Sequence, residues 1–301
     1  MVREDVVLAQ LEVTGAADAP VVVLLGGISS SRHVTATASN PAPGWWNGFV
    51  GPGRPVDTLR FRSVSMDYID SPLGDWPLST RDQASALLDA LDEADIGQLH
   101  AVIGASYGGM VALALAELDS SRVERLIVIS SAHQSSPAAT AQRSLQRKVV
   151  ELGYRAGLEA DALVIARGMA MTIYSTPVEL ASRFRSDDPA EREWEIERFL
   201  NLAGERFAEK CAPERFLSLS RSLDLHSVDP RKITSDTTLI GVLEDSLVPP
   251  SQLCELERLI GGPCELVLVS SPHGHDAFLE DQPLIAPIVT RALSSLTGIR
   301  P

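Results

Sequence analysis

The amino-acid sequence is that of an α/β protein, a mostly parallel β-sheet with helices on both faces and an inserted helical lid. Short runs rich in β-branched residues alternate with helix-like stretches, which is the pattern of a parallel sheet. The runs are apolar throughout, as is typical of strands that are buried on both faces. From about residue 135 to residue 229 the alternation stops, and only helical patterns follow.

Five apolar runs are the predicted strands. They are VVVLL at 21–25, LHAVIG at 99–104, RLIVIS at 125–130, TTLIGVL at 237–243 and CELVLVS at 264–270. Two helices are predicted between them, RDQASALLDALDEADI at 81–96 and GGMVALALAELDS at 108–120. The first of these helices follows the capping residues Ser79 and Thr80, which favour a helix start.

The interval from 135 to 229, here called the helical insertion, opens with SPAATAQRSLQRKVVELG. Ser136 is a candidate N-cap, Pro137 suits the first helical position, and Gly153 is the predicted stop. Further helical patterns follow at 159–173, 177–184, 189–209 and 213–222. We therefore expect one α/β core, made of residues 1–134 and 230–301, with the helical insertion as its lid.

The composition describes an ordinary globular chain. Its 301 residues are 45% hydrophobic and 22% charged, which suits one large domain or two small ones. The formal charge of −14, from 40 acids and 26 bases, argues against nucleic acid or an anionic membrane as partner, because both require a basic surface. A small anionic substrate in a local basic pocket remains compatible with this charge.

The cysteines and the N-terminus indicate the compartment. Cys211, Cys254 and Cys264 have neither an even framework nor CxxC spacing, so we predict no disulfide scaffold and no metal site. The N-terminal segment lacks the apolar core of a signal peptide, and the longest apolar runs have the length of strands. We expect a cytoplasmic protein that does not span a membrane.

The segment from Gly104 to Gly109 carries the strongest chemical signal. It reads GASYGG and fits G-x-S-x-G directly after a predicted strand and directly before a predicted helix. Glycines allow the sharp strand-to-helix turn that lifts a serine hydroxyl above a sheet at a helix N-terminus. Ser106 is therefore the candidate nucleophile; the alternative is a serine in a small-residue turn with no chemistry.

A nucleophilic serine needs a base and an orienting acid, which follow it in this order along such folds. Asp245 comes just after the strand TTLIGVL and is the predicted acid, with Glu244 as the competitor. His275 follows the last strand and leads into a new helix, so it is the predicted base, with His273 as the alternative.

An oxyanion hole requires two backbone N–H groups. One is expected from Tyr107, the residue after the nucleophile. The other is expected from the small-residue loop after the first predicted strand, where the sequence leaves Gly27 and Ile28 as alternatives. Together these residues predict acyl-transfer chemistry, but hydrolysis and transfer to another acceptor use the same machinery. A non-catalytic binding protein would require the order of Ser, Asp and His to be accidental.

Four separated segments carry a family resemblance. They are GASYGGMVALALA, the loop GWWNGFVGPGRPVDT at 44–58, SLQRKVVELG at 144–153 and GHDAFLED at 274–281. In this order they resemble the homoserine O-acyltransferases of methionine biosynthesis, which have the α/β-hydrolase fold. The resemblance covers nearly the whole chain and is greatest to the homoserine O-succinyltransferase branch.

The resemblance implies a ping-pong reaction with acyl-CoA as co-substrate and no permanently bound cofactor. Ser106 would take the succinyl group from succinyl-CoA, and His275 would then deprotonate the hydroxyl of L-homoserine for attack on the acyl-serine. By the same resemblance, Arg147 and Asp276 contact the acceptor, a role that suits the carboxylate and ammonium of an amino acid. The resemblance also implies a homodimer that pairs through the lid.

The chain departs from the family at the oxyanion loop, where LGGIS stands in place of His-x-Leu-Thr-Gly. Arg32, shortly after this loop, is a candidate partner for the free carboxylate of a succinyl group. The stretch 135–148 contains Arg143, Arg147 and Lys148 and no acid, so its helix face is a further candidate for a carboxylate or a CoA phosphate. The alternatives that stay open are acetyl-CoA as donor, serine as acceptor, and an esterase or thioesterase with the same triad.

Overall fold

A seven-stranded sheet organises the molecule in the computed structural model, which describes residues 9–71 and 77–294. The strands are β1 (Leu11–Thr14), β2 (Val21–Leu25), β3 (Arg62–Met66), β4 (Leu99–Ala105), β5 (Val123–Ile129), β6 (Asp236–Val242) and β7 (Cys264–Val269). Their spatial order is β1-β3-β2-β4-β5-β6-β7. Only the edge strand β1 is antiparallel to its neighbour, so the sheet is mostly parallel, as the sequence predicts.

All five predicted strands are confirmed within one or two residues at each end, whereas β1 and β3 were missed. The sequence of β3 is RSVSM, and its two serines interrupt the apolar pattern by which a buried strand is recognised. Both serines are satisfied in the sheet: Ser65 Oγ donates to the carbonyl of Leu24 at 2.7 Å, and Ser63 Oγ donates to that of Thr14 at 3.3 Å. A buried hydroxyl with a backbone partner costs little, so a polar pattern does not exclude a central strand.

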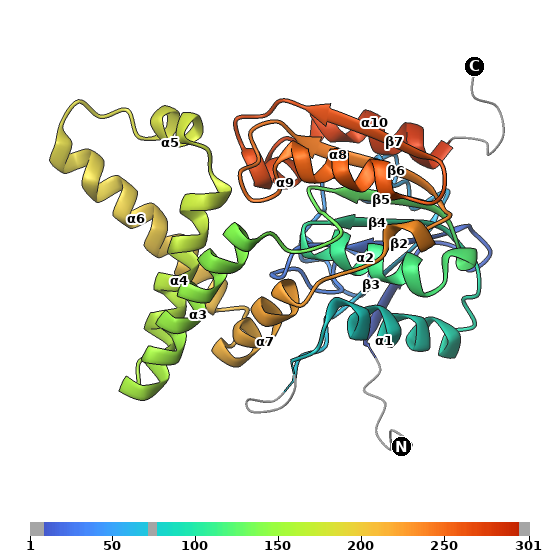
Figure 1. The fold of residues 1–301 in the computed structure, drawn as a ribbon, viewed down its shortest axis with the longest axis horizontal. Helices are drawn as coiled ribbons and strands as arrows, with labels where there is room; N and C mark the ends of the chain where they lie inside the picture. Colours follow the sequence, from blue (N-terminus) through green and yellow to red (C-terminus); the bar gives the residue numbers. More distant parts are fainter. Residues whose placement is uncertain (1–8, 72–76, 295–301) are drawn as a thin grey trace.

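Helices cover both faces of the sheet (Figure 1). The apolar residues of α1 (Thr80–Glu93), α2 (Tyr107–Leu118) and α8 (Pro250–Leu259) pack in one core cluster, and those of α10 (Gln282–Ser294) pack in the other. Successive residues of β2 divide between them, since Val23 belongs to the first cluster and Leu24 to the second. The sheet is therefore buried on both sides.

The helical insertion forms five helices at one side of the sheet, on the left of Figure 1. They are α3 (Pro137–Ala156), α4 (Glu159–Tyr174), α5 (Pro177–Arg183), α6 (Pro189–Ala208) and α7 (Pro213–Asp224). They have a small apolar core of their own, which includes Val150, Leu163 and Phe207. A backbone bridge between Gln134 and Ser227 joins the two ends of the insertion, so the chain leaves the sheet and returns at one place.

The start of α3 is as predicted, but its end is not. The Ser136 side chain accepts a hydrogen bond from the Ala139 N–H, and Pro137 is the first helical residue. The predicted stop at Gly153 is wrong, because the helix continues to Ala156 and ends at Gly157, which has a left-handed φ of 70°. Gly153 instead allows α4 to approach closely, since a Cβ there would meet the side chain of Ala162.

Short elements complete the described chain. They are the 3-10 turns Ser120–Arg122, Pro230–Lys232 and Gly274–Asp276, and α9 (Ala277–Glu280). Of the helices that the structure describes, none is both long enough and apolar enough to cross a membrane.

Candidate active site

Ser106 lies on a strained turn between β4 and α2. Its backbone has φ 54° and ψ −122°, a conformation that costs a non-glycine residue of the order of 1–3 kcal/mol. The surrounding structure holds the turn in place: the Ser106 carbonyl accepts hydrogen bonds from the N–H groups of Gly109 (3.0 Å) and Met110 (3.2 Å). Gly108 is required here because a Cβ would meet the carbonyl of Leu25 in β2. The turn presents the serine side chain at the N-terminus of α2.

Ser106, His275 and Asp245 form one hydrogen-bonded line. Ser106 Oγ lies 2.8 Å from His275 Nε2, and His275 Nδ1 lies 2.8 Å from Asp245 Oδ2. A carboxylate only accepts, so Nδ1 carries the proton that it donates to Asp245, and Nε2 is free to accept from the serine hydroxyl. His275 is 3% exposed and Asp245 2%, which keeps both partners out of bulk water.

The loop after β6 fixes the carboxylate of Asp245. Its Oδ1 accepts hydrogen bonds from the N–H groups of Leu247 and Val248, both at 2.9 Å. The two alternatives are placed elsewhere. Glu244 points to the loop after β7 and accepts from Ser270 Oγ at 2.6 Å, and His273 Nδ1 lies 3.7 Å from Glu179.

The environment of His275 favours its protonated form. Burial alone would lower its pKa, but the charge and hydrogen bond of Asp245 outweigh burial and raise the pKa above the ordinary value of 6.5. The negative charge of Asp276 also raises this pKa, and the positive charge of Arg143 lowers it. A raised pKa suits a base that must take up a proton, hold it while a tetrahedral intermediate exists, and then return it to a leaving group.

Two backbone segments meet at the nucleophile as candidate oxyanion donors. The N–H of Tyr107 belongs to the first residue of α2. On the other side, Gly27 and Ile28 line the same cavity as Ser106. The Gly27 carbonyl accepts from the N–H and the hydroxyl of Ser30, at 2.9 and 2.7 Å, so this loop is a closed turn. Both candidates for the second donor therefore stay open.

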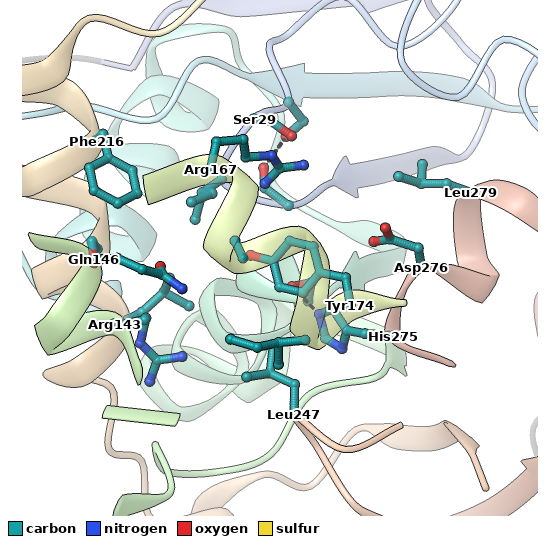
Figure 2. Close-up of a pocket in the computed structure, with 18 of the residues that line it drawn as sticks. Ser29, Arg143, Gln146, Arg167, Tyr174, Phe216, Leu247, His275, Asp276 and Leu279 are labelled. Carbon is teal, nitrogen blue, oxygen red and sulfur yellow. Dashed lines mark hydrogen bonds between the residues drawn. The ribbon is translucent and has the colours of Figure 1, made fainter. Parts of the chain in front are cut away.

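The cavity above Ser106 lies between the sheet and the helical insertion (Figure 2). The insertion contributes polar and aromatic side chains, namely Gln142, Arg143 and Gln146 of α3, Arg167 and Tyr174 of α4, and Phe216 of α7. The core contributes Ser29, Trp45, Leu247, His275, Asp276 and Leu279, among others. A substrate in this cavity would touch catalytic groups on one side and helix faces on the other.

Arg167 and Asp276 are a cation and an anion that face this cavity (Figure 2). The guanidinium of Arg167 lies over the rings of Tyr174 and Phe207, at 5.2 and 4.9 Å from their centroids. It has no carboxylate within ion-pair distance among the residues that the structure describes. Burial raises the pKa of Asp276, while the charges of His275 and Arg167 lower it, and burial prevails.

Two of the arginines singled out from the sequence lie elsewhere. Arg147 does not line the cavity within the described part of the chain; its Nη1 lies 2.7 Å from Asp224 Oδ2 and donates to the carbonyl of Ser220 at 3.0 Å. Arg143, one helical turn earlier, lines it instead. Arg32 pairs with Asp67 at 2.8 Å, and among the described residues it is not part of the cavity lining.

Sequence reasoning missed Arg167 as a site residue. No motif marks it, because α4 reaches the cavity only through its packing on α3 and α6. Within residues 9–71 and 77–294, no group of three or more His, Cys, Asp or Glu side chains is arranged to hold a metal ion.

The comparisons with known proteins agree with this geometry. A family model described as the α/β hydrolase fold matches residues 20–282. In three dimensions, the crystal structure of a homoserine O-acetyltransferase from Bacillus anthracis superimposes with a TM-score of 0.85, covering 96% of this chain and 93% of that one at 19% sequence identity. The chain is thus an α/β-hydrolase-fold protein.

Two curated relatives define its place within that fold. A homoserine O-succinyltransferase of Xanthomonas campestris pv. campestris is 39% identical over 289 residues, which cover 94% of this chain and 78% of that protein. A serine O-succinyltransferase of Frateuria aurantia is 32% identical over 86% of this chain and 84% of that protein. The chain belongs to the family of these O-succinyltransferases.

Proposed function

We propose that this protein is an acyl-CoA-dependent O-acyltransferase that moves a succinyl group from succinyl-CoA to the hydroxyl of L-homoserine, a step of methionine biosynthesis. One observation carries the proposal: the buried line from Ser106 through His275 to Asp245 opens into a cavity that also presents Arg167 and Asp276. A simple esterase needs the first part only. An amino-acid acceptor needs both.

The first half-reaction loads the enzyme. Ser106 Oγ attacks the thioester carbonyl of acyl-CoA while His275 Nε2 takes the hydroxyl proton. The N–H of Tyr107 and an N–H of the loop at Gly27 or Ile28 stabilise the developing oxyanion. When the tetrahedral intermediate collapses, the carbon–sulfur bond breaks, His275 returns the proton to the departing sulfur, and CoA leaves as the thiol. The product is an acyl ester on Ser106.

The second half-reaction transfers the acyl group. The acceptor hydroxyl replaces CoA, His275 Nε2 takes its proton, and the acceptor oxygen attacks the ester carbonyl. The same oxyanion donors act again, and His275 returns the proton to Ser106 Oγ as the acyl–serine bond breaks. Asp245 keeps the imidazole in one tautomer and stabilises its positive charge in both halves. The helical insertion, as a lid on the core of residues 1–134 and 230–301, would exclude water that competes with the acceptor.

We assign the acceptor zwitterion to Arg167 and Asp276. The carboxylate and ammonium of an amino acid are bonded to the same carbon, so they require a cation and an anion near one another. The positive charge of Arg167 lowers the pKa of Asp276, and both side chains face the cavity. Arg147, for which the family resemblance implies this contact, would then support the site indirectly through its ion pair with Asp224.

A second hollow supports acyl-CoA as the donor. It adjoins the catalytic cavity along Ser29, Trp45 and Arg167, which line both. Its lining includes Arg206 of α6 and Lys210, two residues beyond the end of that helix, and both are exposed. In a chain of net charge −14, such a group of cations suits the phosphates of CoA, while the pantetheine arm reaches toward Ser106.

Dimerisation through the helical insertion is part of the proposal. Leu145 and Leu152 of α3 and Ile165 of α4 are each more than half exposed, and α3 and α4 pack against each other. Apolar side chains exposed on neighbouring helices are typical of a protein interface. A cytoplasmic location fits the use of acyl-CoA.

The test follows CoA thiol release from succinyl-CoA and acetyl-CoA, each with and without homoserine or serine. Sustained release of CoA thiol that requires homoserine supports the proposal. A preference for serine would change only the identity of the acceptor and leave the rest of the proposal in place. Release at the same rate without an amino acid indicates an esterase or thioesterase, and no release from either donor indicates a binding protein. Ser106→Ala is the control, because all turnover must depend on this hydroxyl.

A further inference from the structure

A buried tyrosine contacts both backbone segments of the candidate oxyanion hole. Tyr68 follows β3 by two residues, is 2% exposed and belongs to the first core cluster. Its hydroxyl donates a hydrogen bond to the carbonyl of Gly26 at 2.7 Å. Its ring packs edge-on against the ring of Tyr107, with 4.7 Å between the two ring centroids. Tyr68 therefore joins the loop after β2 to the residue after the nucleophile.

The hydrogen bond from Tyr68 fixes the peptide group between Gly26 and Gly27. This peptide is trans, so its carbonyl and its N–H point in opposite directions. Because Tyr68 holds the Gly26 carbonyl, the N–H of Gly27 points away from the phenol. A hydrogen bond to a carbonyl also polarises the N–H of the same peptide and makes it a stronger donor. Burial raises the pKa of Tyr68 well above its ordinary value, so the phenol stays protonated and able to donate.

The next peptide group, between Gly27 and Ile28, is held by Ser30. The Gly27 carbonyl accepts hydrogen bonds from the N–H of Ser30 at 2.9 Å and from its hydroxyl at 2.7 Å. By the same geometry, the N–H of Ile28 points away from Ser30. The side chain of Ile28 packs against the apolar core of the insertion, which adds an apolar anchor to the loop. Each peptide that can supply the second oxyanion donor is thus held by a hydroxyl on its carbonyl.

The loop after β2 lies close against the turn that carries Ser106. A Cβ on Gly108 would lie 2.7 Å from the carbonyl oxygen of Gly26, so this carbonyl borders the first turn of α2. Gly27 and Ile28 line the same cavity as Ser106. A change in the direction of either loop peptide would therefore act at the carbonyl of an acyl group on Ser106. Misplacement of a catalytic group by about 1 Å can lower a rate by about 100-fold.

We infer that the hydroxyls of Tyr68 and Ser30 are positioning groups that aim the backbone N–H groups of this loop at the acyl carbonyl. They act through the carbonyls of Gly26 and Gly27, and the N–H groups remain the catalytic donors. The role applies to both half-reactions, because an oxyanion forms at the same place in each. The inference rests on the acyl-serine chemistry of the proposed function.

The first test measures acylation of Ser106 in Tyr68→Phe, which keeps the ring and removes the hydroxyl. In single-turnover experiments with succinyl-CoA, we expect the maximal rate of acylation to fall about tenfold, less than the roughly 100- to 1000-fold cost of losing an oxyanion donor outright. The half-saturating concentration of succinyl-CoA should stay within about twofold, because the lost interaction acts on the transition state. An unchanged maximal rate in the folded variant would overturn the role of Tyr68.

Infrared spectroscopy of the acyl-enzyme provides a readout that a loss of stability alone would not move. A donor that is isotopically labelled at the acyl carbonyl carbon isolates the stretching band of the ester on Ser106. Hydrogen bonds from the oxyanion donors weaken this C=O bond and lower the wavenumber of its band. The band should therefore move to higher wavenumber in Tyr68→Phe and, by a smaller amount, in Ser30→Ala.

Ser30→Ala also keeps the inference testable should Tyr68→Phe not fold, because the N–H of Ser30 still holds the Gly27 carbonyl in that variant. A band at the wild-type position in every variant that folds would overturn the inference.

Two comparisons separate this inference from its alternatives. Tyr154→Phe removes the hydroxyl of an α3 tyrosine that packs against the apolar core of the insertion, and it should leave the acylation rate and the ester band unchanged. The same band shift in Tyr154→Phe would overturn the inference, because any loss of a tyrosine hydroxyl would then produce it.

A p-nitrophenyl ester can acylate the same serine without CoA. If the wild type reacts with this ester but with neither CoA donor, the proposed function fails, and the band of the ester-derived acyl-enzyme still decides the inference. CoA-dependent transfer with an unmoved band in the variants refutes this inference alone.

Discussion

The sheet edge and the helical insertion contribute different kinds of side chain to one cavity. At the sheet edge, Ser106, Asp245 and His275 follow strand ends, and each is held by hydrogen bonds to the other members or to the backbone. On the insertion, Arg143 and Arg167 project from helices α3 and α4 and line the cavity. We propose that the core supplies the catalytic groups and that the insertion determines which acceptor they serve.

The largest effect is expected from the core. In Asp245→Asn the amide can donate to His275, which favours the wrong tautomer, so kcat should fall by about 10³- to 10⁴-fold for every donor and acceptor. Initial rates with both CoA donors measure it. If Asp245→Asn lost activity with only one of the two donors, the core would also influence the choice of donor, which would contradict the proposed division of roles between core and insertion.

The pH profile of the wild type tests the same site. The base must be neutral to accept a proton, and the pKa of His275 is raised mainly by Asp245 against the effect of burial. Activity should therefore rise with pH through an apparent pKa above 6.5. In Asp245→Asn the residual activity should show an acidic limb at lower pH, because the neighbouring negative charge is gone. If the acidic limb of the pH profile stays at the same pH in Asp245→Asn, a group other than His275 controls this limb.

An intermediate effect is expected from Arg167→Gln on the insertion. KM for the amino acid should rise about 10- to 100-fold, because the carboxylate loses a charge-assisted partner. The burst of CoA release in the absence of acceptor should keep its rate and amplitude, since the acylation step does not use the acceptor site. Stopped-flow thiol detection measures the burst, and steady-state rates measure KM. A slower burst would place Arg167 at the donor instead.

The smallest effect is expected where the two regions touch. The hydroxyl of Tyr107 lies 2.7 Å from that of Ser222 in α7 and joins the core to the insertion. Tyr107→Phe should lower the free energy of unfolding by about 1 kcal/mol, as measured by denaturant titration. Transfer activity should stay within a few-fold, because the proposed oxyanion donor is the backbone N–H. A loss comparable to that of Asp245→Asn would give the phenol itself a catalytic role.

The same division explains what the sequence predicts. Ser106, Asp245 and His275 are recognisable because each follows a strand, and parallel strands bring their carboxyl ends to one edge. Strand β3 escapes recognition because Ser63 and Ser65 are paired only in the folded sheet. The helices of the insertion are predictable, but their rotation about their own axes is not. Arg143 and Arg147 share one helix face, and tertiary packing alone decides that Arg143 reaches the cavity.

The central claim is that Ser106 carries the acyl group between two substrates. The most direct measurement is intact-protein and peptide mass spectrometry after incubation with succinyl-CoA alone, followed by addition of L-homoserine. We predict a mass increase of one succinyl group, located on Ser106, that homoserine discharges rapidly to O-succinylhomoserine and that water discharges slowly. Formation of O-succinylhomoserine by a protein that never carries the acyl group, or an adduct that water discharges as fast as homoserine does, would contradict this account.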